Sequence, residues 1–590
     1  MDSKTTTVPV IAWKIGGDQG EGIDSTGDAL ATVANRMGYH VYGYKTFSSR
    51  IKGGHTNYKV RIGVDPLEAT TETTDILVAL NQETIDKNVA EVPSGGFVLA
   101  DQSFSPKLPD GCPAHLVELP LTDIAKEVGS VLMRNMVAVG ASAALLNLPL
   151  EPFDSYVERR FGSKGAAVVS SNQAAVRRGY DEIQARVGHL LDIRLGAPHS
   201  GDRLLMSGND ALALGAIAGG CRVMAAYPIT PASDVMEDLI KWFPLVGGVV
   251  VQAEDEMAAV LIAIGAGFAG ARGMTATSGP GFSLMQEAIG LASMTETPVV
   301  IADIQRSGPS TGMPTKQEQS DFLQMVNGSH GEAPRIVLTP SSIEEIFADG
   351  MDAFNLADRY QCPVLVASDL SLGLWKRTVE RSAIDYQRAP IDRGLMVSEE
   401  ELRELGRDVF KRYQFTESGV SPRSVPGMPF GQFLATGNEH GENGKVTEDP
   451  GNRERMMHKR LHKLDHFERE SIRSEGPADA DIMLVAIGST VGILREAKAA
   501  LAAQGHRVGL TWLRYISPFP VEETRAALSQ AQRVLVVEQN ATGQLLSMMK
   551  MHGIGHEPRF SSFLKVNGVP FTPEEVVREV NGLLPVREVV

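Results

Sequence analysis

The stretch Gln252–Met285, QAEDEMAAVLIAIGAGFAGARGMTATSGPGFSLM, places three acidic residues in front of an apolar helix. The acids are Glu254, Asp255 and Glu256, and the strand after the helix ends in the glycine-rich loop Thr277–Gly281. A helix followed by an apolar strand indicates an α/β domain. Carboxylates directly before a run of Ala, Val, Leu and Ile point to a functional site. The alternative is that these acids only cap the helix and stabilise its dipole.

The same alternation of apolar strands and helices extends along most of the 590 residues. At the N-terminus the strand 10–17, the helix 25–38 and the strand 39–47 predict a βαβ opening with a parallel sheet. A charged helical run, 182–195, closes this first region. A second region starts near Gly201, and its predicted strands lie within 221–229, 248–254, 274–278, 297–304, 334–340 and 362–368. The third region begins at Ala480, with a helix at 493–505 and strands within 507–515 and 533–540.

Chain length and composition predict a multidomain α/β protein, since 590 residues correspond to about three to four domains. Between Arg377 and Gly476 the chain becomes polar, glycine-rich and charge-dense. We therefore expect an extended connector with embedded helices there. The predicted division has four segments: 1–198, 199–376, 377–476 and 477–590.

Charge and cysteine content exclude several classes of protein. The formal net charge of −16 argues against a nucleic-acid-binding protein, which would carry a basic face. The three cysteines, Cys112, Cys221 and Cys362, lie far apart, so this chain alone builds no disulfide framework, metal site or iron–sulfur cluster. The most apolar run, Met257–Gly270, falls short of the roughly 20 residues that cross a membrane. We expect a cytoplasmic protein with reduced thiols and no nucleic-acid or membrane partner.

The segment Ala225–Ser233, AAYPITPAS, ends a strand with two prolines and a threonine. Thr230 precedes a proline and so suits the N-cap of a helix, and Pro231 suits its first position. In an open α/β sheet, ligands bind at such strand ends, where free N–H groups attract anions. The hydroxyl of Thr230 is therefore a candidate ligand for a carboxylate or a phosphate. A well-made strand-to-helix corner without a ligand is the alternative.

Arg306 follows a predicted strand that ends at Gln305, and Thr311 lies beyond a glycine–proline turn. The planar guanidinium matches a carboxylate group, and threonine adds a short donor beside it. A surface ion pair of Arg306 is the alternative interpretation.

Together with the polar segment 436–445, TGNEHGENGK, these elements closely resemble the α subunit of 2-oxoacid:ferredoxin oxidoreductases, in family order and over nearly the whole chain. The best match is to the type that acts on 2-oxoglutarate, with the γ-type domain fused at the N-terminus. The resemblance implies a γ-type domain over 1–198, a pyrimidine-binding domain of thiamine-diphosphate enzymes over 199–376 and a transketolase-type C-terminal domain over 477–590. The C-terminal motif 536–545, VVEQNATGQL, resembles the last of these and offers no catalytic candidate.

The resemblance implies that Glu256 hydrogen-bonds N1′ of the aminopyrimidine ring and so activates thiamine diphosphate. Glu256 keeps a family-like spacing to the small residues of its helix, whereas Glu254 is the alternative and Asp255 is expected to cap. Three residues of the glycine-rich loop would contact the cofactor: Thr277, Ser278 and Gly279. Four residues would line the oxoacid pocket: Tyr227, Thr230, Arg306 and Thr311.

The N-terminal loop 16–27, GGDQGEGIDSTG, is a possible phosphate cradle at a helix start. Its glycines, at positions 17, 20 and 22, read GxxGxG rather than GxGxxG, and no acid ends the following strand, so nicotinamide-cofactor binding is a weak prediction. In the resembling γ-type domain an Arg-Gly-Gly-like segment follows, and here Lys52 stands where arginine is expected. Coenzyme A phosphates are a candidate ligand. A structural turn at a dimer surface is equally compatible with the sequence.

The chain has no Gly-Asp-Gly motif with a downstream asparagine, the usual mark of a diphosphate–magnesium site. By the resemblance, a β subunit brings that site, Mg²⁺ and a [4Fe–4S] cluster, in an (αβ)₂ assembly. The implied activity is the reversible, coenzyme A-dependent oxidative decarboxylation of 2-oxoglutarate to succinyl-CoA with reduction of ferredoxin. The alternatives are pyruvate or branched-chain 2-oxoacids as substrates, a subunit of a non-redox thiamine-diphosphate enzyme, or a scaffold subunit without catalytic residues.

Overall fold

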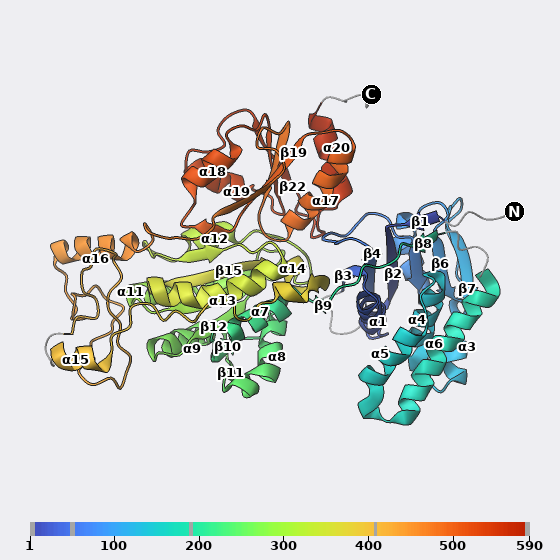
Figure 1. The fold of residues 1–590 in the computed structure, drawn as a ribbon, viewed down its shortest axis with the longest axis horizontal. Coiled ribbons are helices and arrows are strands. Elements are labelled where there is room, and N and C mark those ends of the chain that lie inside the picture. Colours follow the sequence, from blue (N-terminus) through green and yellow to red (C-terminus); the bar gives the residue numbers. More distant parts are fainter. Residues whose placement is uncertain (1–5, 48–53, 188–192, 406–409, 585–590) are drawn as a thin grey trace. The chain divides into compact units, whose positions relative to one another are not determined.

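A computed structural model describes residues 6–47, 54–187, 193–405 and 410–584. The chain forms two compact units (Figure 1). Unit 1 comprises Met1–Met206, Trp375–Ala383 and Thr572–Val576, and unit 2 comprises Ser207–Leu374, Ile384–Phe571 and Val577–Val590. The predicted division into four segments remains a prediction. Residues 203–206 and 377–380, which lie in two different predicted segments, pair with each other as strands of the unit 1 sheet.

The core of unit 1 is an eight-stranded mixed sheet. In spatial order its strands are β7 (His115–Leu119), β6 (Phe97–Asp101), β5 (Ile76–Ala79), β2 (Val10–Asp18), β4 (His55–Gly63), β3 (His40–Thr46), β16 (Arg377–Glu380) and β9 (Arg203–Met206). Strands β2, β5, β6 and β7 are parallel, and β4 runs antiparallel between β2 and β3. The predicted βαβ opening therefore has its two strands in the same direction but not adjacent, because β4 is inserted between them.

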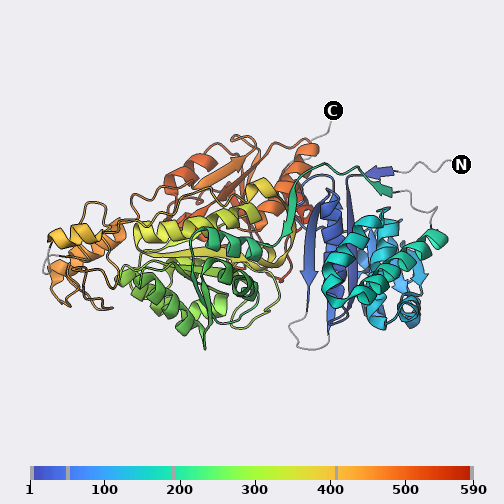
Figure 2. The ribbon, with the colours of Figure 1, turned by 60° about the horizontal axis from the view of Figure 1, so that its bottom comes forward.

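Helices cover both faces of this sheet. They are α1 (Ile23–Arg36), α2 (Gln82–Asn88), α3 (Leu121–Glu127), α4 (Arg134–Leu145), α5 (Glu151–Phe161) and α6 (Ala166–Val187). Residues of α1, α4, α5 and α6 form one core with the sheet (Figure 2, teal helices against blue strands), and α2 packs on the opposite face. Helices α4 and α6 approach closely through Gly140 and Gly179, where a Cβ atom would lie 1.8 Å and 2.0 Å from backbone oxygens of the facing helix.

The helical run predicted over 182–195 is wrong at its C-terminal end. Helix α6 ends at Val187, and Ile193–Leu195 form strand β8, which pairs in parallel with β1 (Thr6–Val8). The reason is a pairing between the two ends of this region of sequence, which local charge and periodicity do not reveal.

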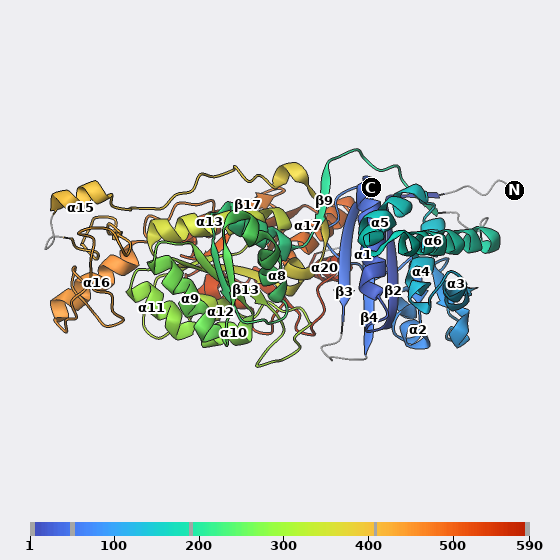
Figure 3. The same ribbon diagram turned by 90° about the horizontal axis from the view of Figure 1, so that it is seen from below.

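Unit 2 contains a seven-stranded sheet whose six parallel strands confirm those predicted for the second region. In order they are β11 (Val249–Gln252), β10 (Val223–Ala226), β12 (Gly273–Thr277), β13 (Val299–Gln305), β15 (Pro363–Asp369), β14 (Ile336–Leu338) and the antiparallel β20 (Tyr515–Ser517). Its helices are α7 (Gly208–Ala218), α8 (Ser233–Trp242), α9 (Glu256–Phe268), α10 (Gly279–Leu284), α11 (Gln286–Met294), α12 (Phe322–Asn327), α13 (Ile343–Tyr360) and α14 (Leu370–Leu374). Helices α9, α10 and α11 lie together (Figure 3) and contact one another. Helices α7 and α13 also contact each other.

A five-stranded sheet completes unit 2 and shares one hydrophobic core with the helices α9, α11 and α12. Its strands in order are β17 (Ile472–Glu475), β19 (Val508–Leu513), β18 (Ile482–Ala486), β21 (Val534–Glu538) and β22 (Phe560–Leu564). The remaining helices are α15 (Glu399–Leu405), α16 (Pro450–His462), α17 (Thr490–Ala503), α18 (Val521–Leu528), α19 (Gln544–Met551) and α20 (Pro573–Leu583). Among the described residues, none of these or the other helices has the length and apolar character needed to traverse a membrane.

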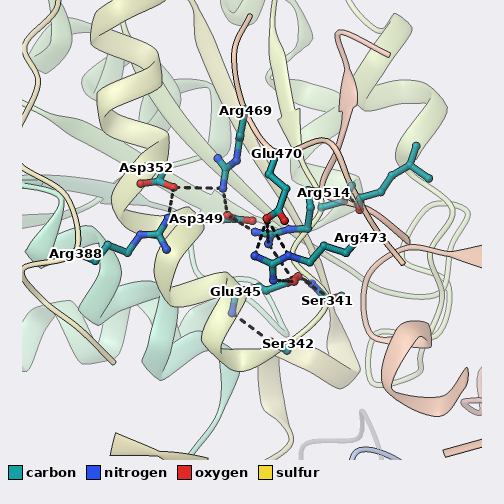
Figure 4. Close-up of polar contacts among 12 residues, drawn as sticks. Ser341, Ser342, Glu345, Asp349, Asp352, Arg388, Arg469, Glu470, Arg473 and Arg514 are labelled. Carbon is teal, nitrogen blue, oxygen red and sulfur yellow. Dashed lines mark hydrogen bonds and ion pairs between the residues drawn. The ribbon is translucent and has the colours of Figure 1, made fainter. Parts of the chain in front are cut away.

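A buried ion-pair network joins α13 to the five-stranded sheet (Figure 4). Asp349 on α13 is fully buried and contacts Arg469 and Arg514, the second at 2.9 Å. Arg514 also contacts Glu345, one helical turn earlier, at 3.0 Å. Because β20 follows Arg514 directly and joins the seven-stranded sheet, this network fixes the C-terminal sheet against the parallel one.

Replacing Arg514 by methionine tests this network. Arg514→Met removes one cation from a cluster in which Asp349 keeps Arg469 and Glu345 keeps Arg473. A lost hydrogen bond to a charged group costs about 1.5–3 kcal/mol, so we expect a loss of that order in the unfolding free energy of unit 2. The matched control is Arg525→Met, because Arg525 pairs with Glu522 on the surface and such pairs contribute at most about 1 kcal/mol. Urea unfolding followed by circular dichroism measures both. Equal midpoints for the two variants would contradict the role of the network.

Candidate functional site

The three acids before α9 have three different environments. Asp255 is the N-cap of α9, and its carboxylate accepts the backbone N–H of Ala258 at 2.7 Å. Glu254 is exposed, whereas Glu256, the first residue of the helix, is only 7% exposed. The predicted capping role of Asp255 is confirmed. Of the two candidate glutamates, Glu256 is the one whose carboxyl group is withdrawn from water.

The glycine-rich loop packs directly against Glu256. Thr277 ends β12, and Gly281 lies in the first turn of α10. A Cβ atom at Gly281 would lie 2.2 Å from Oγ1 of Thr277 and 2.7 Å from Oε1 of Glu256. Only glycine allows the loop to come this close. Ser278 beside it is fully buried, and its hydroxyl has no hydrogen-bond partner within the described residues.

The corner at Thr230 differs from the prediction. Helix α8 begins at Ser233 with Ala232 as N-cap, so neither Thr230 nor Pro231 occupies the predicted helical position. The reason is a tight turn, in which the carbonyl of Ile229 accepts the N–H groups of Ala232 and Ser233 at 2.8 and 3.1 Å. The chain therefore makes one turn before the helix starts. The group of Thr230 that contacts Arg306 is its backbone carbonyl rather than its hydroxyl.

Arg306 joins this corner to a cavity. Its Nη1 donates to the carbonyl oxygen of Thr230 at 2.6 Å, and its Nε is buried without a partner in the described chain. Arg306 and Thr311 line a cavity of about 590 Å³. The other lining residues come from four segments of unit 2: 279–283, 306–311, 318–324 and 540–544.

The other predicted site residues fall into three groups. Gly279 lines the cavity, while Thr277 and Ser278 are buried in the loop behind it. Tyr227 is 42% exposed, and neither it nor Glu256 lines the cavity. Lys52 lies outside the described residues. The structure thus brings together Arg306, Thr311, Gly279 and the backbone of Thr230, and separately Glu256 with the glycine-rich loop.

The C-terminal region contributes to this cavity, which the sequence did not suggest. Asn540 Nδ2 donates to the backbone carbonyl of Gln319 at 3.1 Å, and Gln544 Nε2 donates to that of Ser320 at 2.6 Å. The side chain of Gln319 in turn donates to Asp369 at 2.8 Å and accepts from Thr490 at 3.0 Å. These contacts tie the segment 316–321, and with it the cavity wall, to the five-stranded sheet.

Sequence reasoning also missed three carboxyl groups near the cavity, those of Asp303, Glu318 and Asp321. Asp303 is fully buried on β13, and Glu318 accepts the hydroxyl of Ser307 at 2.7 Å. Burial raises the pKa of Asp303 well above its ordinary value, with a further contribution from the charge of Asp321. Burial and the charge of Glu318 raise the pKa of Asp321 to about 7, against the opposite effect of Arg306. Asp303 was visible in the sequence as the one charged residue of the strand VVIADIQ.

In the glycine loop of unit 1, the backbone is hydrogen-bonded to the carboxylate of Glu21, a residue of the same loop. Glu21 Oε2 accepts the backbone N–H of Asp18 at 2.8 Å, and Glu21 Oε1 pairs with Arg134 at 2.6 Å. Gly17 is required there, because a Cβ atom would lie 2.6 Å from the Glu21 carboxylate. The backbone N–H of Asp18 is thus already bonded to Glu21, whose carboxylate is paired with Arg134, and the phosphate cradle at this loop remains a prediction.

Comparison with known proteins identifies the family. Three family models match: pyruvate ferredoxin/flavodoxin oxidoreductase over 12–182, the thiamine diphosphate-binding model of pyruvate flavodoxin/ferredoxin oxidoreductase over 214–459, and core domain II of pyruvate:ferredoxin oxidoreductase over 480–576. The 2-oxoacid:ferredoxin oxidoreductase subunit alpha of Sulfolobus sp is 32% identical, with 96% of each chain aligned. The chain belongs to this family of α subunits.

Two further relatives are named for 2-oxoglutarate, one of the 2-oxoacids on which members of this family act. The 2-oxoglutarate synthase subunit KorA of Methanothermobacter thermautotrophicus is 38% identical over 64% of this chain and 98% of its own. A solved 2-oxoglutarate:ferredoxin oxidoreductase from Magnetococcus marinus, with 2-oxoglutarate, coenzyme A and succinyl-CoA bound, is 36% identical. The match has a TM-score of 0.90 and covers 98% of this chain and 99% of that one. The family resemblance and the fold class predicted from the sequence are confirmed.

In this α subunit, Asn540→Ala tests whether the C-terminal region holds the cavity wall. The change removes the bond to Gln319, and also the bonds of the Asn540 side chain to Glu538 and to the backbone N–H groups of 542–544 in its own loop. The loss of the Gln319 bond alone, a net of about 1–1.5 kcal/mol of local stability, corresponds to about tenfold faster amide exchange in 317–323. Hydrogen–deuterium exchange with mass spectrometry measures it. Asn581→Ala is the control, because Asn581 bonds only an exposed partner, Gln504. Unchanged exchange in Asn540→Ala would contradict the assignment.

Proposed function

We propose that this chain is the α subunit of a 2-oxoglutarate:ferredoxin oxidoreductase, which converts 2-oxoglutarate and coenzyme A to succinyl-CoA and CO₂ and passes electrons to ferredoxin. The proposal rests above all on one observation. The relative that matches over nearly the full length of both chains, at 36% identity, binds 2-oxoglutarate, coenzyme A and succinyl-CoA. The cavity beside Arg306 supplies the polar, partly enclosed pocket that a small oxoacid requires.

The residues around Glu256 fit thiamine diphosphate. A buried carboxylate lies against a glycine that admits no side chain, and the buried Ser278 hydroxyl beside them lacks a partner in the described chain. When bound, thiamine diphosphate supplies a nucleophilic carbon and an electron sink for cleaving the bond next to a ketone. Glu256 would hold a proton between its carboxyl group and a ring nitrogen. Thr277, Ser278 and Gly279 would orient the ring through their short loop.

Arg306 and its neighbours would orient the oxoacid. Arg306 keeps its charge, because burial lowers the pKa of its guanidinium but an arginine pKa lies far above neutrality. With Nη1 already bonded to Thr230, the guanidinium is fixed in direction, and its other donors are available to a carboxylate. Thr311 would add a hydroxyl donor from the opposite side of the turn. Tyr227, exposed directly after β10 and not among the residues that line this cavity, is proposed for the oxoacid site from the sequence alone.

A partner chain is expected on the face that carries Glu256. Strand β11 is the edge of the seven-stranded sheet, and Val249 is 54% exposed on it. On α9 beside Glu256, Met257 and Leu261 are 48% and 45% exposed. Exposed apolar residues gathered in this way mark an interaction surface. The relatives are named subunit alpha, and we propose that a β subunit covers this face, brings Mg²⁺ and a [4Fe–4S] cluster, and forms an (αβ)₂ assembly.

Coenzyme A is proposed as the acyl acceptor because the Magnetococcus marinus relative carries it. Lys52, which follows the glycine loop of unit 1 in the sequence, is the residue proposed for the coenzyme A phosphates. The cytoplasmic location expected from the sequence remains a prediction.

Glu256→Gln tests the proposed catalytic role. The amide cannot take up or release a proton, so we expect kcat/KM for 2-oxoglutarate to fall by at least about 100-fold. The chain is co-purified with its β subunit, and anaerobic reduction of viologen with 2-oxoglutarate and coenzyme A is measured. Glu254→Gln, two residues earlier and exposed, is the matched control and should retain activity. Full activity in Glu256→Gln, or equal losses in both variants, would remove Glu256 from the mechanism.

Arg306→Met tests the carboxylate contact. Losing a hydrogen bond to a charged group costs about 1.5–3 kcal/mol, which corresponds to a KM for 2-oxoglutarate about 10- to 150-fold higher. Arg507→Met, at an exposed ion pair with Asp479, controls for the loss of an arginine. The same assay with pyruvate and branched-chain 2-oxoacids identifies the preferred substrate. A KM for 2-oxoglutarate that does not respond to Arg306→Met would place the oxoacid elsewhere.

A further inference from the structure

Arg306, Glu318 and Asp321 line the cavity, and Asp303 lies close enough to Asp321 for their charges to interact, so this group holds more acid than base. Asp303 and Arg306 belong to β13 and its end, while Glu318 and Asp321 belong to the segment that leads into α12. The other cavity segments, 279–283 and 540–544, contain no charged residue. If all three carboxyl groups were ionised, two net negative charges would be buried beside the site that is to bind an anion. Like charges in one buried site cannot all ionise at neutral pH.

Asp321 lines the cavity, and its position there is fixed by contacts with Gln305 and Gly279. Its backbone N–H donates to Gln305 Oε1 at 3.0 Å, which fixes the residue at the start of α12. Its carboxyl group lies against Gly279, where a Cβ atom would come within 2.7 Å of Oδ2. That oxygen is buried without a hydrogen-bond partner in the described chain. An ionised carboxylate would be poorly stabilised in this position.

Asp303 lies behind Asp321 and cannot exchange its proton directly with the cavity. It is fully buried, is not a lining residue, and neither of its carboxyl oxygens has a hydrogen-bond partner among the described residues. Glu318, in contrast, accepts a hydroxyl donor and lines the cavity. The three acids therefore differ in their surroundings: Asp303 is shut away from the cavity, Glu318 is held by a hydroxyl donor, and Asp321 reaches the cavity with a carboxyl oxygen that has no partner in the described chain.

We propose that Asp321 is a specificity-determining residue of the oxoacid site, which must be protonated for the anionic head of the ligand to bind beside Arg306. The protonated carboxyl donates a hydrogen bond or at least removes a repelling charge, whereas the carboxylate competes with the ligand for Arg306. Binding of the anion then takes up one proton from solution. The identity of the natural ligand in this inference rests on the proposed function. The uptake of a proton by Asp321 rests on the geometry of the cavity.

Oxalate tests the inference, because it carries the adjacent carboxylates of an oxoacid head, does not titrate between pH 6 and 9 and has no distal group. Its binding to the complex of this chain with the β subunit is followed by isothermal titration calorimetry in two buffers of different ionisation enthalpy. The pKa of Asp321 is raised to about 7, so the neutral form prevails below that pH and is lost above it. We expect the oxalate Kd to rise by up to about tenfold per pH unit above pH 7, with net proton uptake on binding.

Asp321→Asn is the decisive variant, since asparagine keeps the shape and stays neutral. It should bind oxalate as the wild type does at pH 6, bind it more tightly than the wild type at pH 8.5, and show no proton uptake. In Glu318→Gln the neighbouring charge that raises the pKa of Asp321 is absent, so the rise in Kd should begin at lower pH. Glu557→Gln, at an exposed carboxylate of the C-terminal domain, should leave the profile unchanged.

A wild-type Kd that stays constant from pH 6 to 9, or an Asp321→Asn variant that keeps the wild-type pH dependence, would overturn the inference. Thermal unfolding of each variant separates loss of fold from loss of proton linkage. If 2-oxoglutarate is oxidised but oxalate binding takes up no proton, the proposed function stands and the role of Asp321 fails. If oxalate shows the linkage but no 2-oxoacid is oxidised, the role of Asp321 stands and the proposed function fails.

Discussion

The hydrogen bonds of the Gln319 side chain hold the wall of the cavity in position. This side chain donates to Asp369 at the end of β15 and to the carbonyl of Ile487 after β18, and it accepts from Thr490 on α17. Its backbone N–H donates to the carbonyl of Gln539, and its carbonyl accepts from Asn540. A glutamine satisfied on all sides in a buried position has one orientation. The segment 316–321 is therefore held between the two sheets of unit 2, and Glu318 and Asp321 take their places from it.

This constraint explains why the C-terminal domain is part of the site although it supplies no charged group to the cavity. Asn540 and Gln544 act on the wall through the backbone of Gln319 and Ser320. The buried network of Asp349, Glu345 and Arg514 holds the same domain against α13 from another side. The first set of contacts fixes the segment that carries Glu318 and Asp321, and the second holds the sheet to which this segment is bonded.

The sequence predicted what local signals encode. The six parallel strands of unit 2, the burial of Glu256 behind an apolar helix and the place of Arg306 at a strand end all follow from patterns within a few residues. It did not predict features that depend on distant pairings. Strand β4 separates β2 from β3, and the turn at Ile229 delays the helix that Pro231 was expected to start. The bond between Asn540 and Gln319 joins residues 221 apart in the sequence, so no local pattern reveals it.

We propose that the cavity beside Arg306 holds the anionic head of the oxoacid. A crystal structure of the complex of this chain with its β subunit, soaked with oxalate at pH 6, tests this claim most directly. Oxalate is expected in the cavity, with one carboxylate within hydrogen-bonding distance of the Arg306 guanidinium and next to the carboxyl group of Asp321. Oxalate bound elsewhere, with Arg306 contacting only Thr230, would contradict it.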